Sequence, residues 1–210
     1  MGSFIKFIFK AAIWLAVIAL VIAGILRVAF VDVAQVGHNA MAPTLIFGDQ
    51  VLAWRGSTPE LGDIAICEHP GRLGELVMGR VVATSGMLVE QERGTLIVEG
   101  TREAVDWEEQ VRFLDAATDE DREYRTGIAK RGNTEHRLFV PVRGRADVRT
   151  HRVAEGRIYL LGDNRGHVGM DSRYFGDVDP STCTGQVFMR LLAGDDGGAG
   201  LGHRPLDILN

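Results

Sequence analysis

The sequence predicts a mainly β protein, either an antiparallel β barrel or a set of folded sheets, preceded by one N-terminal transmembrane α-helix. Two observations lead to this prediction. The only apolar run of membrane length lies at the N-terminus, and the rest of the chain consists of short runs of β-forming residues separated by Gly, Asp and Pro. About 175 of the 210 residues remain after the apolar segment, which is enough for one domain with a hydrophobic core.

We expect residues 1–34 to form a short cytoplasmic stub and a membrane anchor. The charge-free run between Lys10 and Arg27 gives about 24 Å of helix at roughly 1.5 Å per residue, short of a ~30 Å hydrocarbon core. Apolar residues 28–31 prolong it, and both flanking cations can extend their charged ends out of the bilayer. These features favour one full span.

The positive charges of Lys6 and Lys10 favour a cytoplasmic N-terminus. The chain is then a single-pass protein of the inner (plasma) membrane, with a periplasmic or otherwise extracytoplasmic C-terminal domain. A cleaved signal peptide is the alternative, but residues 30–34 match poorly the small residues that a cleavage site requires.

Runs rich in β-forming residues and bounded by turn residues predict the strands. Between two of these runs, the sequence Glu92-Arg93-Gly94 predicts a hairpin with glycine at its turn. The predicted strands are 51–54, 63–67, 76–78, 80–83, 87–90, 95–99, 137–142, 157–161 and 186–189.

We assign residues 35–192 to the β domain. Within it, residues from about 101 to 152 are rich in charge and poor in aliphatic side chains, which predicts a solvated insertion with a short helix near 106–114. A docking surface for a partner is the alternative for this insertion. Residues 193–210 are Gly-rich and predict a flexible C-terminal tail.

Charge and cysteine usage exclude several functions. The formal net charge is -5 and no Lys/Arg run is present, which argues against a nucleic-acid partner. The two cysteines lie far apart, without a Cys-x-x-Cys pair, so neither a zinc knuckle nor a thioredoxin-like site is expected. We predict no cofactor and no bound metal.

Four short motifs occur in a fixed order after the anchor. The first is Met41-Ala42-Pro43-Thr44-Leu45 with Gly48-Asp49, and the second is residues 62–66, Gly-Asp-Ile-Ala-Ile. The third is Arg80-Val81-Val82 with Gly86. The fourth combines two sets of residues: Gly162, Asp163, Asn164 and Arg165, then Asp171, Ser172, Arg173, Tyr174 and Gly176.

Each motif alone is weak, but the ordered set after an anchor resembles signal peptidase I, the membrane-anchored serine peptidase. This resemblance spans most of the chain from Met41 to Gly185. It implies a signal-peptidase-like β fold. It also implies a serine nucleophile and a lysine general base, in which a buried neutral amine takes the proton of the serine hydroxyl.

The catalytic positions that the resemblance implies are altered in this chain. Ala40 stands where the family has its nucleophile, and Gly79 stands where it has its lysine. His38 replaces the hydroxyl residue that assists the oxyanion hole. The segment between Arg165 and Asp171 is one residue longer than usual and lacks the serine that orients the lysine. We therefore predict no catalytic residues and interpret the chain as a pseudoenzyme.

The favoured hypothesis is a catalytically inactive, signal peptidase I-like membrane protein that acts as a binding or accessory subunit of a membrane protein complex. Its partners would be the lipid bilayer and other membrane subunits or an extended peptide segment. The resemblance places an extended peptide between Gln35-Val36-Gly37 and Leu76-Val77-Met78, where main-chain hydrogen bonds require no catalytic residues.

Two alternatives remain open. One is an active signal peptidase-like endopeptidase with relocated catalytic residues, for which Thr84 or Ser85 would supply the hydroxyl and His38 or His167 the base. The other is a protein that binds signal peptides without cleaving them. For the two histidines, hydrogen-bonded or solvated side chains are the default, and a metal site is a weaker alternative.

The resemblance also places Cys67 and Cys183 on two strands of the β domain. We expect two buried free thiols. A disulfide is the alternative, and it requires the two Cα atoms to lie within about 7 Å in an oxidising compartment.

Overall fold

The fold is described from a computed structural model of residues 2–115, 118–131, 134–144, 148–195 and 200–209. In this part of the chain the strands form three antiparallel sheets, and none of them closes into a barrel. Of the two predicted architectures, folded sheets are therefore confirmed and a barrel is wrong. The parts of the predicted insertion and tail at residues 116–117, 132–133, 145–147, 196–199 and 210 lie outside the described residues.

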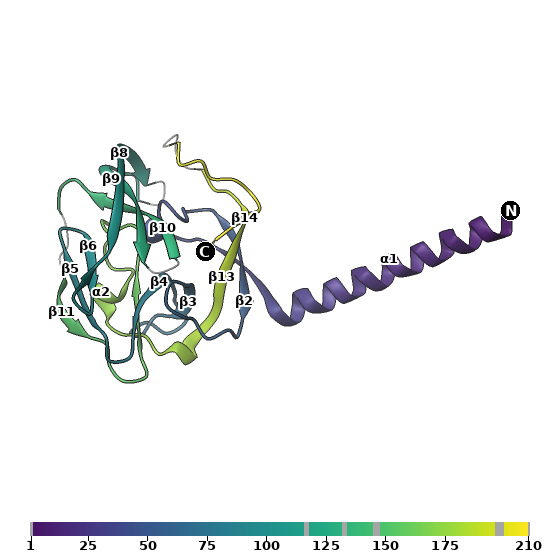
Figure 1. The fold of residues 1–210 in the computed structure, drawn as a ribbon, viewed down its shortest axis with the longest axis horizontal. Coiled ribbons are helices and arrows are strands. Elements are labelled where there is room, and N and C mark those ends of the chain that lie inside the picture. Colours follow the sequence, from purple (N-terminus) through teal and green to yellow (C-terminus); the bar gives the residue numbers. More distant parts are fainter. Residues whose placement is uncertain (1, 116–117, 132–133, 145–147, 196–199, 210) are drawn as a thin grey trace.

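The N-terminal helix α1 (Gly2–Phe30) projects away from the β body (Figure 1). Its described side chains are mostly apolar and exposed, such as Phe7 at 69%, Trp14 at 67% and Leu20 at 72%. No helix in the described part of the chain is both long enough and apolar enough to cross a membrane. The predicted helix is confirmed, while its role as a membrane span stays a prediction.

The largest sheet contains five strands that the sequence predicts and two, Val31–Gln35 and Asp207–Ile208, that lie outside the predicted strands. Its strand order is β1-β2-β13-β3-β4-β12, with β14 paired to β13. Aliphatic residues that alternate or run continuously along these strands bury their side chains in the core. Its strands are β1 (Val31–Gln35), β2 (Gln50–Arg55), β3 (Ile64–Glu68), β4 (Leu76–Thr84), β12 (Ile158–Leu161), β13 (Cys183–Leu192) and β14 (Asp207–Ile208).

A second sheet has the strand order β11-β5-β6-β7. The predicted hairpin is confirmed at its centre, where Arg93 (φ 52°) and Gly94 (φ 80°) both take the positive φ of a tight two-residue turn. Its strands are β5 (Leu88–Glu92), β6 (Thr95–Val98), β7 (Thr101–Arg102) and β11 (Val148–Arg152).

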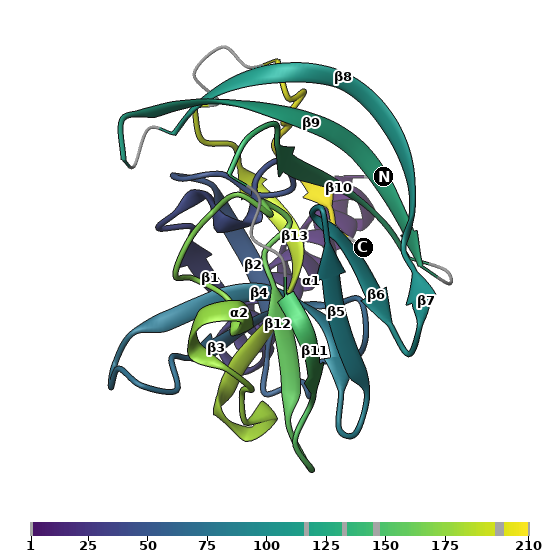
Figure 2. The same ribbon diagram turned by 90° about the vertical axis from the view of Figure 1, so that its left-hand side faces the viewer.

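The third sheet, β10-β9-β8, is formed by the charge-rich segment. Its strands are β8 (Ala104–Asp115), β9 (Glu120–Arg131) and β10 (Thr134–Pro141), and Figure 2 shows β8 and β9 as long curved strands across one end of the body. The predicted helix near 106–114 is wrong, because these residues pair with β9. The segment is also not simply solvated, since Phe113, Tyr124 and Phe139 form a buried aromatic cluster.

The short helices lie at the turns: η1 (Asn39–Met41), α2 (Ser172–Phe175) and η2 (Pro180–Thr182). The prediction of a separate flexible tail is wrong over residues 200–209. There, β14 pairs with Met189 and Arg190 of β13, and Leu201 is buried in the aromatic cluster. Apolar residues that follow the Gly-rich run, such as Leu201, are buried and hold this segment on the β domain.

The two cysteines form a disulfide, so the expectation of free thiols is wrong. Cys183 of β13 stands directly opposite Cys67 of β3 in the sheet register. The pairing of β13 with β3 therefore brings the two sulfur atoms within bonding distance, which the sequence separation of 116 residues could not indicate.

We expect reduction of this disulfide to lower the free energy of unfolding by about 2–5 kcal/mol, because a bond across so long a loop restricts the unfolded chain strongly. Denaturant unfolding with and without reductant measures the change, and the Cys67→Ser/Cys183→Ser double variant should match the reduced protein. Equal stability of the oxidised and reduced proteins would contradict this expectation.

Candidate functional site

The loop after β1 carries Ala40, the predicted former nucleophile position, which is buried within η1. Its N–H donates to Nδ1 of His38 at 3.2 Å, and its carbonyl accepts a hydrogen bond from the N–H of Asn164 at 3.0 Å. Gly162 approaches the same carbonyl so closely that an added Cβ would lie 2.4 Å from it. The first and last motifs are thus in direct contact around Ala40.

Gly79, the predicted former base position, lies in the middle of β4 opposite Ala65 of β3. An added Cβ at Gly79 would lie 3.0 Å from Cβ of Leu160 on β12, which is tighter than an ordinary contact. A larger side chain here requires Leu160 to move. Neither Ala40 nor Gly79 carries a group that can attack a carbonyl or take a proton.

His38 and His167 lie near each other beside this loop, with ring centroids 5.7 Å apart. The pKa of His38 is lowered to about 4, chiefly by burial and also by the neighbouring His167, while Asp115 opposes the shift. Burial also lowers the pKa of His167. Both rings are therefore neutral at pH 7, and His38 serves as the N-cap of η1 by accepting from Ala40.

These histidines do not form a metal site in the described residues, where no cluster of three or more His, Cys, Asp or Glu side chains is arranged for a metal ion. A cavity of about 200 Å³ beside them is lined by Asp115, Tyr124, Gly166 and His167, among others. Asp115 itself accepts a hydrogen bond of 2.6 Å from the amide of Asn39.

Asp163 and Arg80 form the central ion pair of the site, buried to 1% and 2% exposure. Nε and Nη2 of Arg80 donate to the two carboxylate oxygens at 3.0 and 2.8 Å, a bidentate arrangement. Nη1 of Arg80 donates to the carbonyl of Gly62 at 2.7 Å, and the hydroxyl of Thr44 donates to Asp163 at 2.5 Å. Residues of all four motifs thus meet at this one ion pair.

The ionisation of Asp163 follows from these partners. Burial by itself raises the pKa of this carboxyl, but Arg80, together with smaller contributions from neighbours such as the Thr44 hydroxyl, outweighs burial and holds the pKa below its usual range. Asp163 is therefore ionised at neutral pH, and the pair is a buried salt bridge.

The other motif residues hold the surrounding loops. Asp171 accepts from Arg173 at 2.7 Å and from the N–H of Gly162 at 3.1 Å, which fixes the loop around α2. Ser172 accepts from the N–H of Leu160 at 2.9 Å. These contacts orient the last motif against β12.

In the first motif, Asp49 binds Nε of Arg190 at 3.1 Å and caps the N–H of Ile46 at 3.0 Å. Gly48 takes a φ of 88°, which favours glycine. Met41 is fully buried in the core, and Pro43 follows a cis peptide bond.

Two strand edges near the Ala40 loop are open. Val36 exchanges main-chain hydrogen bonds with Gly48 and Asp49, so the main-chain groups of Gln35 and Gly37 point to the other side of β1, the terminal strand of its sheet. No other strand of the described residues pairs there.

On β4, Val81 bonds to the β3 side of the strand, so Leu76 and Met78 direct their main-chain groups to the opposite side. There β12 pairs with β4 only from Arg80 onward. Val36 and Met78 pack in one hydrophobic cluster, which brings the two predicted peptide-binding segments together. Val77 is buried in a hydrophobic cluster with residues of β3, β12 and β13.

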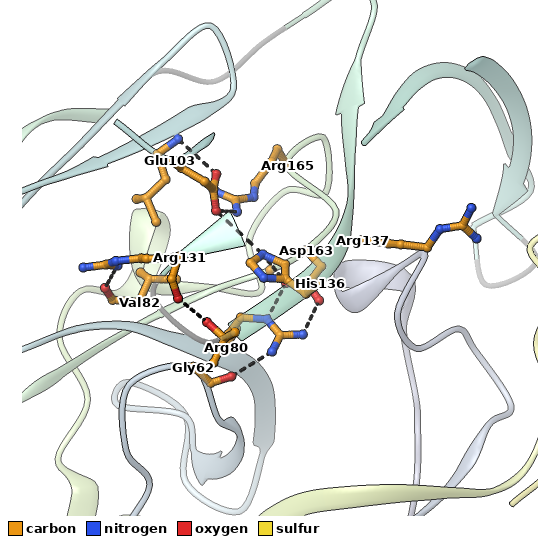
Figure 3. A network of polar contacts seen from close by, with 12 residues as sticks. Gly62, Arg80, Val82, Glu103, Arg131, His136, Arg137, Asp163 and Arg165 are labelled. Carbon is orange, nitrogen blue, oxygen red and sulfur yellow. Dashed lines mark hydrogen bonds and ion pairs between the residues drawn. The ribbon is translucent and has the colours of Figure 1, made fainter. Parts of the chain in front are cut away.

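The structure adds Glu103 and His136 to the site, which the sequence analysis did not identify. Arg165 donates to Glu103 at 3.4 Å, and His136 lies 3.7 Å from carboxylate oxygens of both Glu103 and Asp163 (Figure 3). The predicted insertion supplies both residues. A sequence signal existed: His136 alternates with the apolar residues Leu138 and Val140, which places it on the buried face of β10.

Comparison with known proteins agrees with this arrangement. The model of the family described as "Signal peptidase, peptidase S26" matches residues 9–192. This chain belongs to that family. The predicted resemblance to signal peptidase I is therefore confirmed at the level of the family, which contains serine peptidases. That this member is inactive stays a prediction.

Among the similar solved structures is a signal peptidase I from Enterococcus faecalis V583, with 25% sequence identity and a TM-score of 0.37. The similarity covers 62% of this chain and 97% of the Enterococcus chain. A comparison with curated proteins gives no match.

We expect Asp163→Asn to lower the free energy of unfolding by about 3–5 kcal/mol, because it leaves the buried Arg80 charge without its partner. Denaturant unfolding of the full chain in detergent measures this change. The control is Arg55→Ala, which breaks the half-exposed pair with Asp32 and should cost about 0–1 kcal/mol. Similar losses for the two variants would contradict a special role for the buried pair.

Stability should also fall as the pH drops from about 6.5 to about 4. Burial, with the charges of Arg80 and Arg165 opposed by Asp163, lowers the pKa of His136 from 6.5 to about 4. In this window the unfolded chain binds protons that the folded chain does not, so stability is complete above 6.5 and declines below it. For His136 the loss is about 3 kcal/mol.

The measurement is denaturant unfolding across this pH range for the wild type and for His136→Gln. The variant should lose stability less steeply because one titrating ring is gone. An unchanged pH profile in the variant would show that His136 does not carry the effect.

Proposed function

We propose that this chain is a catalytically silent member of the signal peptidase family that binds an extended polypeptide segment as an accessory subunit of a membrane protein complex. One observation carries the proposal. The family frame keeps its open strand edges beside the Ala40 loop, while Ala40 and Gly79 offer no reactive group. Strand addition uses main-chain hydrogen bonds alone, so a peptide can bind where it cannot be cleaved.

The packing around the former base position supports the loss of activity. A Cβ at Gly79 would lie 3.0 Å from Cβ of Leu160, so a lysine there requires Leu160 to shift. His38 and His167 do not replace the missing lysine as a base, because Nδ1 of His38 already accepts a hydrogen bond from the N–H of Ala40.

The arrangement argues against relocated catalytic residues. Ser85 lies six residues beyond Gly79, about 20 Å along an extended strand at roughly 3.3 Å per residue. Its hydroxyl accepts a hydrogen bond of 3.1 Å from the N–H of Gly156, and the hydroxyl of Thr84 faces the sulfur of Met87. Both hydroxyls thus belong to the turn after β4, away from the Ala40 loop.

The exposed apolar surface of α1 supports membrane attachment. Side chains such as Phe9, Ile13 and Leu15 are exposed to 69%, 54% and 67%, and water is an unfavourable solvent for so much apolar area. We infer that α1 anchors the chain in the membrane with Lys6 on the cytoplasmic side and the β domain outside the cytoplasm, which agrees with the membrane association of the family.

The proposal predicts that a photo-crosslinking residue at Leu76 captures an extended segment of a partner in membranes, because Leu76 is 52% exposed and stands at the open edge of β4. Mass spectrometry of the crosslinked product identifies the segment. Trp54 is the matched control: it is 44% exposed, but it pairs with Val31 of β1 on one side and with Gln186 of β13 on the other. It should give at least tenfold less product.

A second photo-crosslinking residue at Gln35, on the edge of β1, should capture the same segment. Leu76→Pro removes the outward N–H of β4 and should abolish this Gln35 crosslink, whereas Leu76→Ala should preserve it. Capture of an intact membrane subunit supports the accessory role, and capture of uncleaved signal peptides supports the non-cleaving alternative. Cleavage of a preprotein by the purified chain above a blank would overturn the proposal in favour of an active peptidase.

A further inference from the structure

A second concave region lies where the three sheets meet, apart from the Ala40 loop. It is a cavity of about 620 Å³, bounded by the residues before β3, by β4 and β6, and by the ends of β9 and β10. Leu61, at its edge, is 43% exposed, so the cavity reaches the surface there. A volume of this size is typical of small-molecule sites.

One wall contains a buried side chain whose polar atoms have no partner. His136 is 8% exposed, and neither of its ring nitrogens makes a hydrogen bond. Its distances of 3.7 Å to Glu103 and Asp163 are too long for hydrogen bonds, and the neutral ring forms no ion pair with them. Buried polar groups without partners are costly, so an unpaired ring facing a cavity indicates a missing ligand.

The charges around the cavity are not balanced. Arg80 is paired with Asp163, and Arg165 is paired with Glu103 although its Nε and Nη1 make no hydrogen bond. Arg131 is a third guanidinium, half-buried at the cavity wall, whose Nη1 donates to the carbonyl of Val82. Three guanidinium groups and two carboxylates leave one net positive charge at the wall of the cavity, on a side chain that is half-buried.

The remaining wall is apolar. Val81, Val82 and Leu96 are buried and line the cavity together with the more exposed Leu61. Arg131 makes one side of the cavity cationic, and the apolar wall suits hydrocarbon. Figure 3 shows the guanidinium of Arg131 turned toward the carbonyl of Val82 and His136 lying with Glu103 and Asp163, while Arg137 points away from this region.

We propose that this cavity, which the unpaired ring of His136 lines, binds a small monocarboxylate with an apolar body, whose carboxylate pairs with Arg131 and whose hydrocarbon part packs on Val82 and Leu96. A single negative charge matches the single uncompensated cation. Because the cavity lies between the sheets, the bound acid would contact all three of them. This site does not depend on the proposed peptide-binding edge, and either can fail without the other.

The test uses the full-length protein in detergent with 4-fluorobenzoate as the probe, observed by fluorine NMR line broadening. We expect saturable binding, with the neutral isostere 4-fluorobenzamide at least tenfold weaker. Arg131→Gln should weaken binding of the acid about tenfold or more, as expected for loss of a hydrogen bond between charged groups. The matched control is Arg137→Gln, on β10 but outside the cavity, which should leave binding unchanged.

Two further variants keep the result decisive if Arg131→Gln fails to fold. Arg131→Lys retains the charge and should retain part of the affinity. Leu61→Trp, at the exposed edge, should weaken binding by narrowing the entrance without changing any charge. Absence of saturable binding, equal binding of acid and amide, or equal effects of the Arg131 and Arg137 variants would overturn the proposal.

Discussion

The buried ion pair between Arg80 and Asp163 is the interaction on which the arrangement of this protein depends. Each charge alone would be strongly disfavoured in the interior, and the bidentate geometry compensates for this cost only because the remaining polar atoms also have partners. Gly62 and Thr44 supply those partners. The pair therefore holds four separated segments in one geometry: the loop after β1, the turn before β3, the strand β4 and the loop after β12. Loss of either charge would leave the other unpaired and would affect all four segments.

Around this pair, the first and last family motifs are in contact, while two positions beside them carry no reactive side chain. The hydrogen bonds that position the last motif against the Ala40 loop are complete, from Asn164 to the carbonyl of Ala40 and from Gly162 to Asp171. The atoms that would attack a peptide bond or take its proton are absent from the sequence at Ala40 and Gly79. The groups that remain available for binding are main-chain hydrogen-bond donors and acceptors. Open strand edges on β1 and β4 can pair with an extended segment because such pairing depends on backbone groups and not on side-chain reactivity.

The charge-rich segment is part of the core structure. It contributes β8, β9 and β10 and the aromatic cluster of Phe113, Tyr124 and Phe139. Through His136 it also reaches the ion pair. The cavity at the junction of the sheets exists because this segment packs against β4 and β6 without filling the space between them. An interior with uncompensated positive charge and an unpaired ring is unusual, since burial penalises both.

The sequence by itself determined the family, the helix α1 and the aliphatic strands, because β-forming runs bounded by turn residues and ordered motifs are local signals. It also determined that Ala40 and Gly79 lack reactive groups, which follows from residue identity alone. Only the tertiary structure decided the rest. Strands β8 and β9 were not predicted, since their outward faces are polar and their partners distant. Strand register placed Cys183 opposite Cys67, and the packing of three sheets brought His136 to Asp163. Such contacts depend on pairing between segments far apart in the chain, which no local pattern records.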